Sequence, residues 1–288
     1  MGMLDGKVVM ITGGSRGQGR AHALTSAREG ADVLIVDVTE EVENLPTTTS
    51  YALATAQDMA TTVKEVEALG RRIVAVPADV RIQADLNAAV AQGIEQLGQI
   101  DVLIANAGIH SLAPFWEMTD ESWEDMIAIN LSGVWRSAKA VAPHMIERQT
   151  GSIVMISSVN GLEAGPNYSH YTAAKHGVVG LMKTVALELA PHGVRCNAIH
   201  PGAVRSGMTD NQAAWDMYAG HPGGTIDDLV SAGRHYGALK GTTFMPADTI
   251  ANAALFLNSN LASTITGISL PVEAGHLLIP GVNAAPVD

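Results

Sequence analysis

The stretch KVVMITGGSRGQGRAHAL, residues 7–24, decides the fold of this chain. A short run of apolar and β-branched residues ends at Thr12, a glycine-rich turn follows it, and a helical pattern begins after the turn. Glycines in such a turn allow the backbone to bend tightly and to approach a pyrophosphate, which then lies over exposed N–H groups of the next helix. The stretch therefore predicts a strand, a nucleotide-binding turn and a helix. The candidate contacts in the turn are Gly13, Ser15, Arg16, Gly17, Gln18 and Gly19.

The next apolar run, ADVLIVD, ends at Asp37, where a carboxylate can accept hydrogen bonds from an adenosine ribose. The 2′-phosphate of NADP would bring negative charge against Asp37, and a like-charge contact at 4 Å costs on the order of 4 kcal/mol at an effective dielectric near 20. Arg16 could attract such a phosphate, but no Lys or Arg follows Asp37 in VDVTEEVE. We therefore expect NAD as the cofactor.

Strand-like runs recur along the chain with helical stretches between most of them. They lie at residues 7–12, 31–37, 72–80, 101–108, 151–158, 194–202 and 267–275. This alternation predicts an α/β protein with a seven-stranded, doubly wound parallel sheet that carries helices on both faces. The 288 residues, 47% of them hydrophobic, are enough for one substantial core, and nothing in the sequence suggests a second domain.

Charge and hydropathy restrict the partners and the compartment. The chain has 29 acidic and 17 basic residues, which disfavours nucleic acid and anionic membrane surfaces. We find no run of 18 apolar residues and no signal peptide before the first strand. The single cysteine, Cys196, lies in an apolar run and is expected in the core, so we predict a cytoplasmic protein.

Three polar side chains form a candidate catalytic group. Tyr171 and Lys175 are four apart in the helical segment NYSHYTAAKHGVVGLMKTVALEL, so their side chains emerge from one helix face. A nearby ammonium is expected to lower the pKa of the phenol, which makes Tyr171 a candidate general acid and base. Ser158 ends a predicted strand, and ligands bind beyond the carboxyl ends of parallel strands. The other polar residues at such ends are Asp37, Asp79, Asn106 and His200.

Two other chemistries find little support. A serine hydrolase would need a Gly-x-Ser-x-Gly elbow, which GSIVMISSVNG lacks. None of the ten histidines forms a metal-ligand spacing, and His170 and His176 have no acidic partner in register, so we predict no metal. His110 and His200 at strand ends could touch substrate or be hydrogen-bonded structural residues. Tyr168 is a candidate for the wall of the cleft.

With these residues in place, the chain resembles the short-chain dehydrogenase/reductase family from Lys7 to about Gly275. The resemblance implies one Rossmann-type domain over residues 1–288. Its motifs read Thr12-Gly13-Gly14-Ser15-Arg16-Gly17-Gln18-Gly19, Asp79-Val80, Asn106-Ala107-Gly108, Asn130, Ser158, Tyr171-x-x-x-Lys175, and Pro201-Gly202 with Ser206. Two positions depart from the common pattern, because Ala105 replaces an asparagine and Ser206 replaces a threonine.

The resemblance also implies the role of each site residue. Tyr171 exchanges a proton with the substrate oxygen, Ser158 hydrogen-bonds that oxygen, and Lys175 holds the nicotinamide ribose and lowers the pKa of the tyrosine. Asn130 anchors a water of the proton relay. The implied cofactor contacts are Asp79 and Val80 at the adenine, Asn106, Ala107 and Gly108 along the cleft, and Ile199, Val204 and Ser206 at the nicotinamide carboxamide, with Pro201 and Gly202 between them.

Residues 38–56 form an insertion that is too long for an ordinary crossover. About 18 residues precede the next helical pattern, with Pro46, a threonine run and an apolar patch at residues 51–54. The insertion could be a mobile surface loop. Its Tyr-x-Leu-Ala-Thr-x-x-Asp segment, however, is similar to the mycofactocin-associated branch of the family, which includes carveol-dehydrogenase-like enzymes. That resemblance implies that the insertion folds over the cofactor, so that NAD stays bound and electrons leave to mycofactocin, a peptide-derived redox carrier.

Residues 207–245 form the least regular part of the sequence and are predicted to cover the substrate cleft. Their larger apolar side chains could line a pocket for a bulky alicyclic substrate or could serve packing alone. These residues are Met208, Trp215, Met217, Tyr218, Tyr236, Phe244 and Met245. We expect a small hydrophobic substrate, a secondary alcohol or its ketone, cyclic and terpenoid or steroid-like.

Three functions remain open. The first is an alcohol dehydrogenase with retained NAD, and the second is a freely exchanging NAD(H)-dependent reductase of a hydrophobic ketone or 3-oxoacyl substrate. The third, a nucleotide-binding regulator without turnover, is disfavoured because the four residues Asn130, Ser158, Tyr171 and Lys175 are intact. Relatives are commonly tetramers that pair equivalent helices, and the helical runs at residues 120–147 and 168–190 permit a homotetramer.

Overall fold

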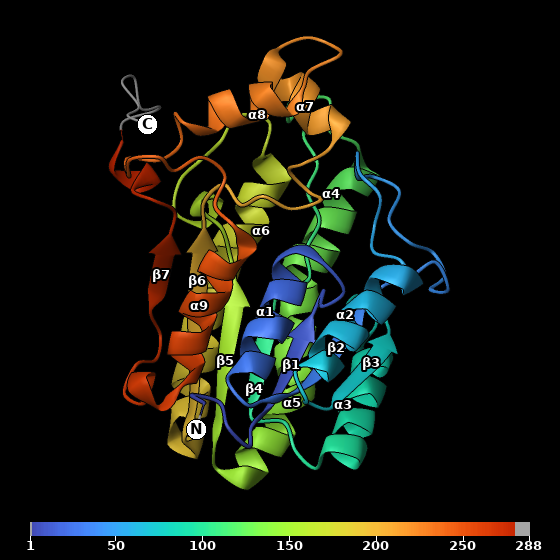
Figure 1. Cartoon of the computed structure of the whole chain (residues 1–288), viewed down its shortest axis with the longest axis vertical. Helices are drawn as coiled ribbons and strands as arrows, with labels where there is room; N and C mark the ends of the chain where they lie inside the picture. Colours follow the sequence, from blue (N-terminus) through green and yellow to red (C-terminus); the bar gives the residue numbers. More distant parts are fainter. Residues whose placement is uncertain (1, 280–288) are drawn as a thin grey trace.

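The computed structural model describes residues 2–279, which fold around a seven-stranded parallel sheet (Figure 1). All six pairings between neighbouring strands are parallel. The strands are β1 (Val8–Thr12), β2 (Asp32–Asp37), β3 (Ile73–Pro77), β4 (Val102–Ala105), β5 (Gly151–Ile156), β6 (Val194–Pro201) and β7 (Ser269–Val272). Each falls inside one of the runs that the sequence predicts, so the predicted α/β fold is confirmed.

The order of the strands determines where a ligand can bind. Neighbours in space run β3-β2-β1-β4-β5-β6-β7, so the chain reverses its direction of winding between β1 and β4. Thr12 at the end of β1 is in register with Val36 on one side and Ala105 on the other. Crevices at such a switch point, beyond the carboxyl ends of the strands, are where open α/β sheets bind ligands.

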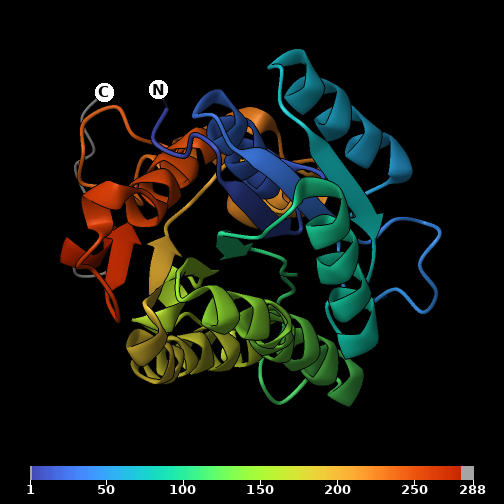
Figure 2. The same cartoon turned by 90° about the horizontal axis from the view of Figure 1, so that it is seen from below.

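Helices cover both faces of the sheet (Figures 1 and 2). The helices on one face are α1 (Gly17–Arg28), α2 (Ala56–Ala68) and α9 (Ala247–Asn258), and those on the other are α3 (Gln83–Leu97), α5 (Val134–Arg148) and α6 (Ser169–Leu189). Figure 1 shows two short helices, α7 (Gln212–Ala219) and α8 (Ile226–Gly233), beyond the carboxyl ends of the strands. No helix in residues 2–279 is long and apolar enough to cross a membrane.

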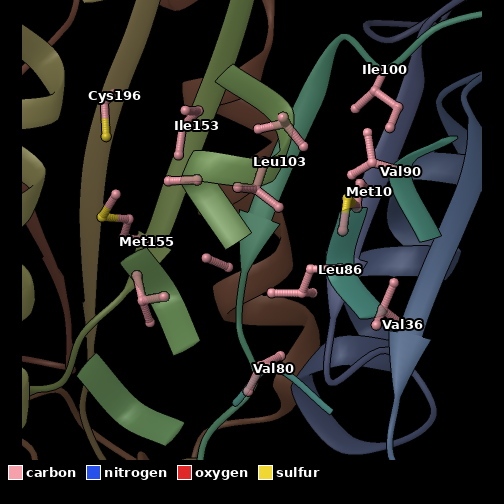
Figure 3. Close-up of a cluster of buried hydrophobic side chains, with 14 of the residues drawn as sticks. Met10, Val36, Val80, Leu86, Val90, Ile100, Leu103, Ile153, Met155 and Cys196 are labelled. Carbon is pink, nitrogen blue, oxygen red and sulfur yellow. The ribbon is translucent and has the colours of Figure 1, made fainter. Parts of the chain in front are cut away.

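The core consists of two apolar layers, one on each face of the sheet. Successive side chains of a strand point to opposite faces, so Met10 packs towards α3 and α5, whereas Val9 and Ile11 pack towards α1 and α9. Figure 3 shows the first layer, in which Cys196 of β6 also lies. The Cys196 side chain is fully buried, as expected, and burial raises the pKa of its thiol.

The predicted helical run at residues 120–147 is interrupted. Helix α4 (Asp120–Ile127) passes into a π-helical turn, Ala128–Gly133, before α5 begins. Such wide turns leave carbonyl groups outside the regular hydrogen-bond ladder and often occur at functional sites. Asn130 lies within this turn.

Residues 207–245 are more regular than the sequence suggests. Asn211 caps α7 by accepting a hydrogen bond from the Ala214 N–H, and Thr225 with Asp228 forms a capping box at the start of α8. Each helix has eight residues, so its periodic pattern is too short to stand out in the sequence. Short 3₁₀ turns at Val159–Gly161, Ala190–His192, Asn260–Ala262 and His276–Leu278 complete the described elements.

Candidate active site

Ser158, Tyr171 and Lys175 come together at the carboxyl end of β5. Ser158 follows this strand and forms a hydrogen bond with Tyr171, which projects from α6. Lys175, one helical turn further on, places its Nζ atom 5.5 Å from the centre of the Tyr171 ring and donates to the Ile156 carbonyl at 2.9 Å. The structure therefore brings together the three groups that the sequence identified as a catalytic set.

The electrostatics of this set differ from the sequence-based expectation. Burial raises the pKa of Tyr171, although the hydrogen bond from Ser158 partly opposes this. The pKa of Lys175 is lowered to about 8, also by burial. Removal of water penalises the charged form of each group, and this penalty outweighs the attraction that we expected to lower the pKa of the phenol.

Asn130 is held by the backbone of Ile109. Its Nδ2 donates to the Ile109 carbonyl and its Oδ1 accepts from the Ile109 N–H, both at 2.8 Å. The side chain is thus engaged with the segment that continues β4. Asn130 consequently joins the π-helical turn to the segment that follows β4.

The glycine-rich turn has the shape that a pyrophosphate requires. A Cβ atom on Gly13, which has a φ of +67°, would lie 2.9 Å from Ala107, and one on Gly19 would lie 1.8 Å from the Gly13 carbonyl oxygen. Arg16, the N-cap residue of α1, gives no side-chain cap, so the N–H groups of the first helical turn remain available. These donors and the close backbone approach fit the phosphates of a dinucleotide.

Asn106 ties the end of β4 to this turn. Its Nδ2 donates to the carbonyl groups of Thr12 and Gly13, each at 3.1 Å. The Thr12 hydroxyl accepts from the backbone N–H groups of Asn106 and Ala107. Asn106, Ala107 and Gly108 lie at the switch point, where the Asn106 amide holds the end of β4 against the glycine-rich turn.

Asp37 lies at the end of β2 beside the same turn. Its Oδ2 accepts from the Ser15 N–H at 2.8 Å and its Oδ1 from the Val38 N–H at 2.9 Å. Burial raises the pKa of the carboxyl group, whereas these hydrogen bonds and the charge of Arg16 oppose the change. Each carboxylate oxygen keeps a lone pair for a further donor such as a ribose hydroxyl.

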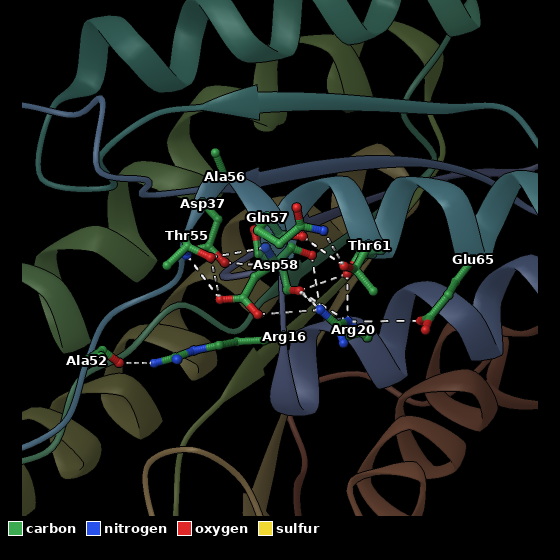
Figure 4. A network of polar contacts seen from close by, with 12 residues as sticks. Arg16, Arg20, Asp37, Ala52, Thr55, Ala56, Gln57, Asp58, Thr61 and Glu65 are labelled. Atoms are coloured by element: carbon green, nitrogen blue, oxygen red, sulfur yellow. Dashed lines mark hydrogen bonds and ion pairs between the residues drawn. The ribbon is translucent and has the colours of Figure 1, made fainter.

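The insertion folds back over the glycine-rich turn. The Arg16 guanidinium donates to the Ala52 carbonyl (Figure 4). The Tyr51 hydroxyl accepts a hydrogen bond at 3.0 Å from the N–H of His110, which follows β4, and Leu53 packs against the core layer of α3 and α5. The insertion is therefore an ordered strap across the switch point.

The end of the insertion is held by a capping box that our sequence analysis missed. The Thr55 hydroxyl accepts from the Asp58 N–H, and the Asp58 carboxylate accepts from the Thr55 N–H, at the start of α2. Arg20 of α1 also donates to the carbonyl groups of Asp58 and Ser15 (Figure 4). The Thr-x-x-Asp spacing before an apolar helical run was the available signal.

The other end of the insertion is held by an acidic and basic cluster. Arg81 forms an ion pair with Asp79 at 2.7 Å and with Asp125 at 3.3 Å, and it also donates to the Asn44 carbonyl. Thr48 donates to the Asp125 carboxylate. The Asp79 carboxylate, predicted to contact adenine, is thus engaged by Arg81. Val80, also predicted at the adenine, is buried and packs against the π-helical turn.

The predicted nicotinamide-binding residues lie at the end of β6. Gly202 donates to the Val272 carbonyl, and a Cβ atom on it would lie 2.8 Å from Glu273. Val204 is buried and pairs with Met245, whereas Ser206 lies beside Gly17 of the glycine-rich turn. Pro201 and Ile199 are buried in β6. After Ser206 the main chain continues into residues 207–245, the segment predicted to cover the substrate.

All five tyrosines of the chain gather at this site. The Tyr171 ring is 6.0 Å from that of Tyr168, and the Tyr218 ring is 6.1 Å from that of Tyr236. The Tyr168 pKa is raised first by burial and then by the charges of Tyr236 and Tyr171, which places the four phenols near one another. Tyr51 completes the group from the insertion.

The other apolar candidates of residues 207–245 lie in different environments, some packed and some exposed. Phe244 packs 5.5 Å from the Tyr218 ring, so it supports the tyrosines. Met217 is 42% exposed, and Trp215 donates from its indole to Asp210. Met245 serves the core. Tyr218, Tyr236 and Phe244 are therefore assembled, while Met217 stays in contact with solvent.

The two strand-end histidines differ in their environment. His200 is buried, and its Nδ1 lies 2.8 Å from the Ser158 carbonyl, which fits the structural alternative. The His110 ring lies 5.4 Å from the Tyr171 ring, and burial lowers its pKa to about 4, so the ring is neutral at physiological pH. The uncharged His110 ring thus lies beside Tyr171.

This arrangement of turn, strands and catalytic group has counterparts in known proteins, because residues 7–217 match the short chain dehydrogenase family. The chain belongs to this family. Among its relatives, the (-)-trans-carveol dehydrogenase of Rhodococcus erythropolis is 43% identical over 288 residues, which cover 96% of this chain and 100% of that protein.

Solved structures of short-chain dehydrogenases agree with the fold. Carveol dehydrogenase from Mycobacterium avium in complex with NAD gives a TM-score of 0.92 at 41% identity, covering 97% of this chain and 100% of that one. A short chain dehydrogenase from Mycobacterium paratuberculosis bound to NAD gives 0.85 at 35% identity, with 96% and 100% covered. The chain is thus similar to both proteins over nearly its whole length.

Proposed function

We propose that this short-chain dehydrogenase interconverts a cyclic secondary alcohol, terpenoid or steroid-like, and its ketone by means of a tightly retained NAD, with mycofactocin as electron acceptor. The observation that carries the proposal is the strap formed by the insertion, which bonds to Arg16 in the nucleotide turn and to His110 beside the catalytic tyrosine. A nucleotide beneath such a strap cannot leave without breaking these contacts.

NAD fits the residues of the site. The glycine-rich turn offers uncapped N–H groups to phosphates, and Asp37 offers carboxylate lone pairs to ribose hydroxyls but repels a 2′-phosphate. The similarity to carveol dehydrogenase solved with NAD supports the same choice. Val80, Gly108, Val204 and Ser206 would line the remainder of the nucleotide site.

The residues of the chain have separate tasks in the proposed reaction. Bound NAD supplies the acceptor or donor of the hydride. In the direction of oxidation the Tyr171 oxygen takes the proton of the alcohol while its own proton leaves towards Lys175, and Ser158 hydrogen-bonds the same substrate oxygen. Lys175, with an ammonium that burial makes readily deprotonated, holds the ribose and passes the proton on, and Asn130 positions the relay in the π-helical turn.

The aromatic group favours a bulky, mainly apolar substrate. Tyr168, Tyr218 and Tyr236 with Phe244 present rigid ring surfaces next to Tyr171, and the His110 ring is neutral. Such walls can contact an alicyclic ring system over a large area. Short polar alcohols would leave the pocket unfilled, so saturation with them but not with cyclic alcohols would contradict this substrate class.

The first experiment is to denature freshly purified, extensively dialysed protein and to quantify the released nucleotide. About one NAD(H) per chain is expected, and turnover of cyclic alcohols should then need an artificial dye or mycofactocin. Deletion of residues 44–54 should accelerate the loss of nucleotide. An empty wild-type protein that uses added NAD would instead identify the freely exchanging dehydrogenase, and released NADP would contradict the role of Asp37.

We also propose that the protein assembles as a homotetramer, with α4, α5 and α6 at an interface. Trp135 on α5 is 43% exposed and Leu187 on α6 is 77% exposed, and such an interface would cover both side chains. Sedimentation analysis should give four times the 30.0 kDa chain mass. A monomeric protein would contradict this assembly. A cytoplasmic location stays a prediction.

A further inference from the structure

Tyr51 is the residue through which the insertion enters the catalytic centre. Its hydroxyl oxygen accepts the His110 N–H at 3.0 Å, across 59 positions of sequence. Burial raises the pKa of its phenol, the charge of Tyr171 adds to this, and the charge of Arg16 opposes it. The phenol is therefore bonded to the backbone of His110, whose ring lies 5.4 Å from that of Tyr171. The next residue of the insertion, Ala52, is bonded to Arg16.

The proton of the Tyr51 hydroxyl has no acceptor among residues 2–279. A phenol can accept and donate at the same time. Among the hydrogen bonds of residues 2–279, Tyr51 accepts through its oxygen, and no side chain or carbonyl group receives its O–H. Tyr51 is half-buried, so a nucleotide bound beneath the insertion would exclude water from this donor. A donor left unsatisfied in that state is unfavourable by about 1–3 kcal/mol, so an acceptor on the nucleotide would stabilise the bound state.

The neighbours of Tyr51 indicate which ligand supplies this acceptor. Arg16, bonded to Ala52, and the uncapped start of α1 suit a pyrophosphate. Tyr171, which lies beside His110, and Lys175 suit the nicotinamide ribose and the reacting carbon. Oxygen atoms of a dinucleotide would occupy the space between these two groups of residues. A mainly apolar alcohol has a single oxygen, which Ser158 and Tyr171 already bind in the proposed reaction.

We propose that Tyr51 is a cofactor-binding residue: its hydroxyl donates a hydrogen bond to a phosphate or ribose oxygen in the nicotinamide half of the retained NAD. This inference rests on the proposed function. The strap then holds the nucleotide by a direct contact as well as by covering it. The same phenol fixes the His110 backbone, so the nucleotide, the strap and the wall beside Tyr171 form one connected unit.

The substitution Tyr51→Phe tests the hydroxyl alone, because the ring and its packing are kept. The readout is the exchange of bound NAD for isotopically labelled NAD, measured as label per chain against time. We expect exchange to become about 10- to 100-fold faster, as the loss of one hydrogen bond to a charged or polar ligand predicts. An unchanged Tm for unfolding of the nucleotide-free protein would show that the fold is intact.

A control is Thr61→Ala, which removes an exposed hydroxyl on α2 outside the insertion and should leave exchange unchanged. Wild-type exchange in Tyr51→Phe, together with faster exchange after deletion of residues 44–54, would overturn the role of Tyr51 and leave retention by the strap intact. Unchanged exchange in both variants would overturn the proposed function as well. An increased KM for the alcohol at unchanged exchange would assign the hydroxyl to the substrate and overturn the inference.

Discussion

His276 Nε2 lies 2.6 Å from Glu163 Oε1, although the two residues are 113 positions apart. The other ring nitrogen, Nδ1, lies 2.9 Å from the Tyr236 carbonyl, and the ring stacks on that of Tyr236 at 5.7 Å. The two side chains consequently join the loop after β5, which carries Ser158, to Tyr236 in residues 207–245.

Loss of the contact between His276 and Glu163 should loosen residues 207–245, which are predicted to cover the substrate. In Glu163→Gln the charge is lost and the side-chain size is kept, and a partly exposed pair contributes up to about 1 kcal/mol. We expect the KM for a cyclic alcohol to rise about two- to fivefold with kcat nearly unchanged, measured in a dye-coupled assay. Glu67→Gln on exposed α2 is the control. An equal KM in both variants would show that His276 does not hold the cover.

Tyr171→Phe should separate turnover from nucleotide binding. The variant keeps the ring against His110 and Lys175 but has no phenolic proton, so turnover should fall about 10²- to 10⁴-fold. Nucleotide per chain after dialysis should equal that of the wild type. Activity within tenfold of the wild type would show that another group moves the proton. A nucleotide-binding regulator without turnover, the third function considered, would keep its function in this variant.

The charge of Asp37 should decide between NAD and NADP. In Asp37→Asn the repulsion of a 2′-phosphate disappears, so the ratio of Kd values for NADP and NAD should fall by at least about tenfold. The amide has one acceptor oxygen where the carboxylate has two. Its NH2 group therefore faces the N–H of Ser15 or of Val38, and a lower Tm is expected. Competition binding by calorimetry measures the ratio. An unchanged ratio would mean that another residue of the turn distinguishes NAD from NADP.

The buried Lys175 should make stability rise with pH in the alkaline range. Its pKa is about 8 in the folded protein, against 10.5 for an ordinary lysine, so between these pH values the unfolded chain binds more protons. The free energy of unfolding therefore increases from pH 8 towards 10.5, by on the order of 3 kcal/mol from this group.

The measurement compares denaturant unfolding of nucleotide-free wild type and Lys175→Met across that pH range. The difference in the free energy of unfolding between the two proteins should change by on the order of 3 kcal/mol across this range, because the other titrating groups are common to both proteins. Parallel curves would mean that Lys175 keeps its proton in the fold, for example through a buried water or a shift of Tyr171 towards the phenolate.

Local chemistry in the sequence determined the strands, the nucleotide turn and the catalytic group. β-branched runs, glycine spacing and the four-residue separation of Tyr171 and Lys175 depend on neighbours along the chain, so they can be identified without tertiary structure. The seven strands and the membership of the family were predicted from these features and are confirmed.

Tertiary structure decided what each group does in its surroundings. Burial raises the pKa of Tyr171 against the effect expected of Lys175, because the loss of water depends on all the elements packed around the site. Tyr51 appeared in the sequence as part of an apolar patch, and its contact with His110 spans 59 positions. Such long-range contacts follow from how the sheet and its loops close on one another, which no local pattern encodes.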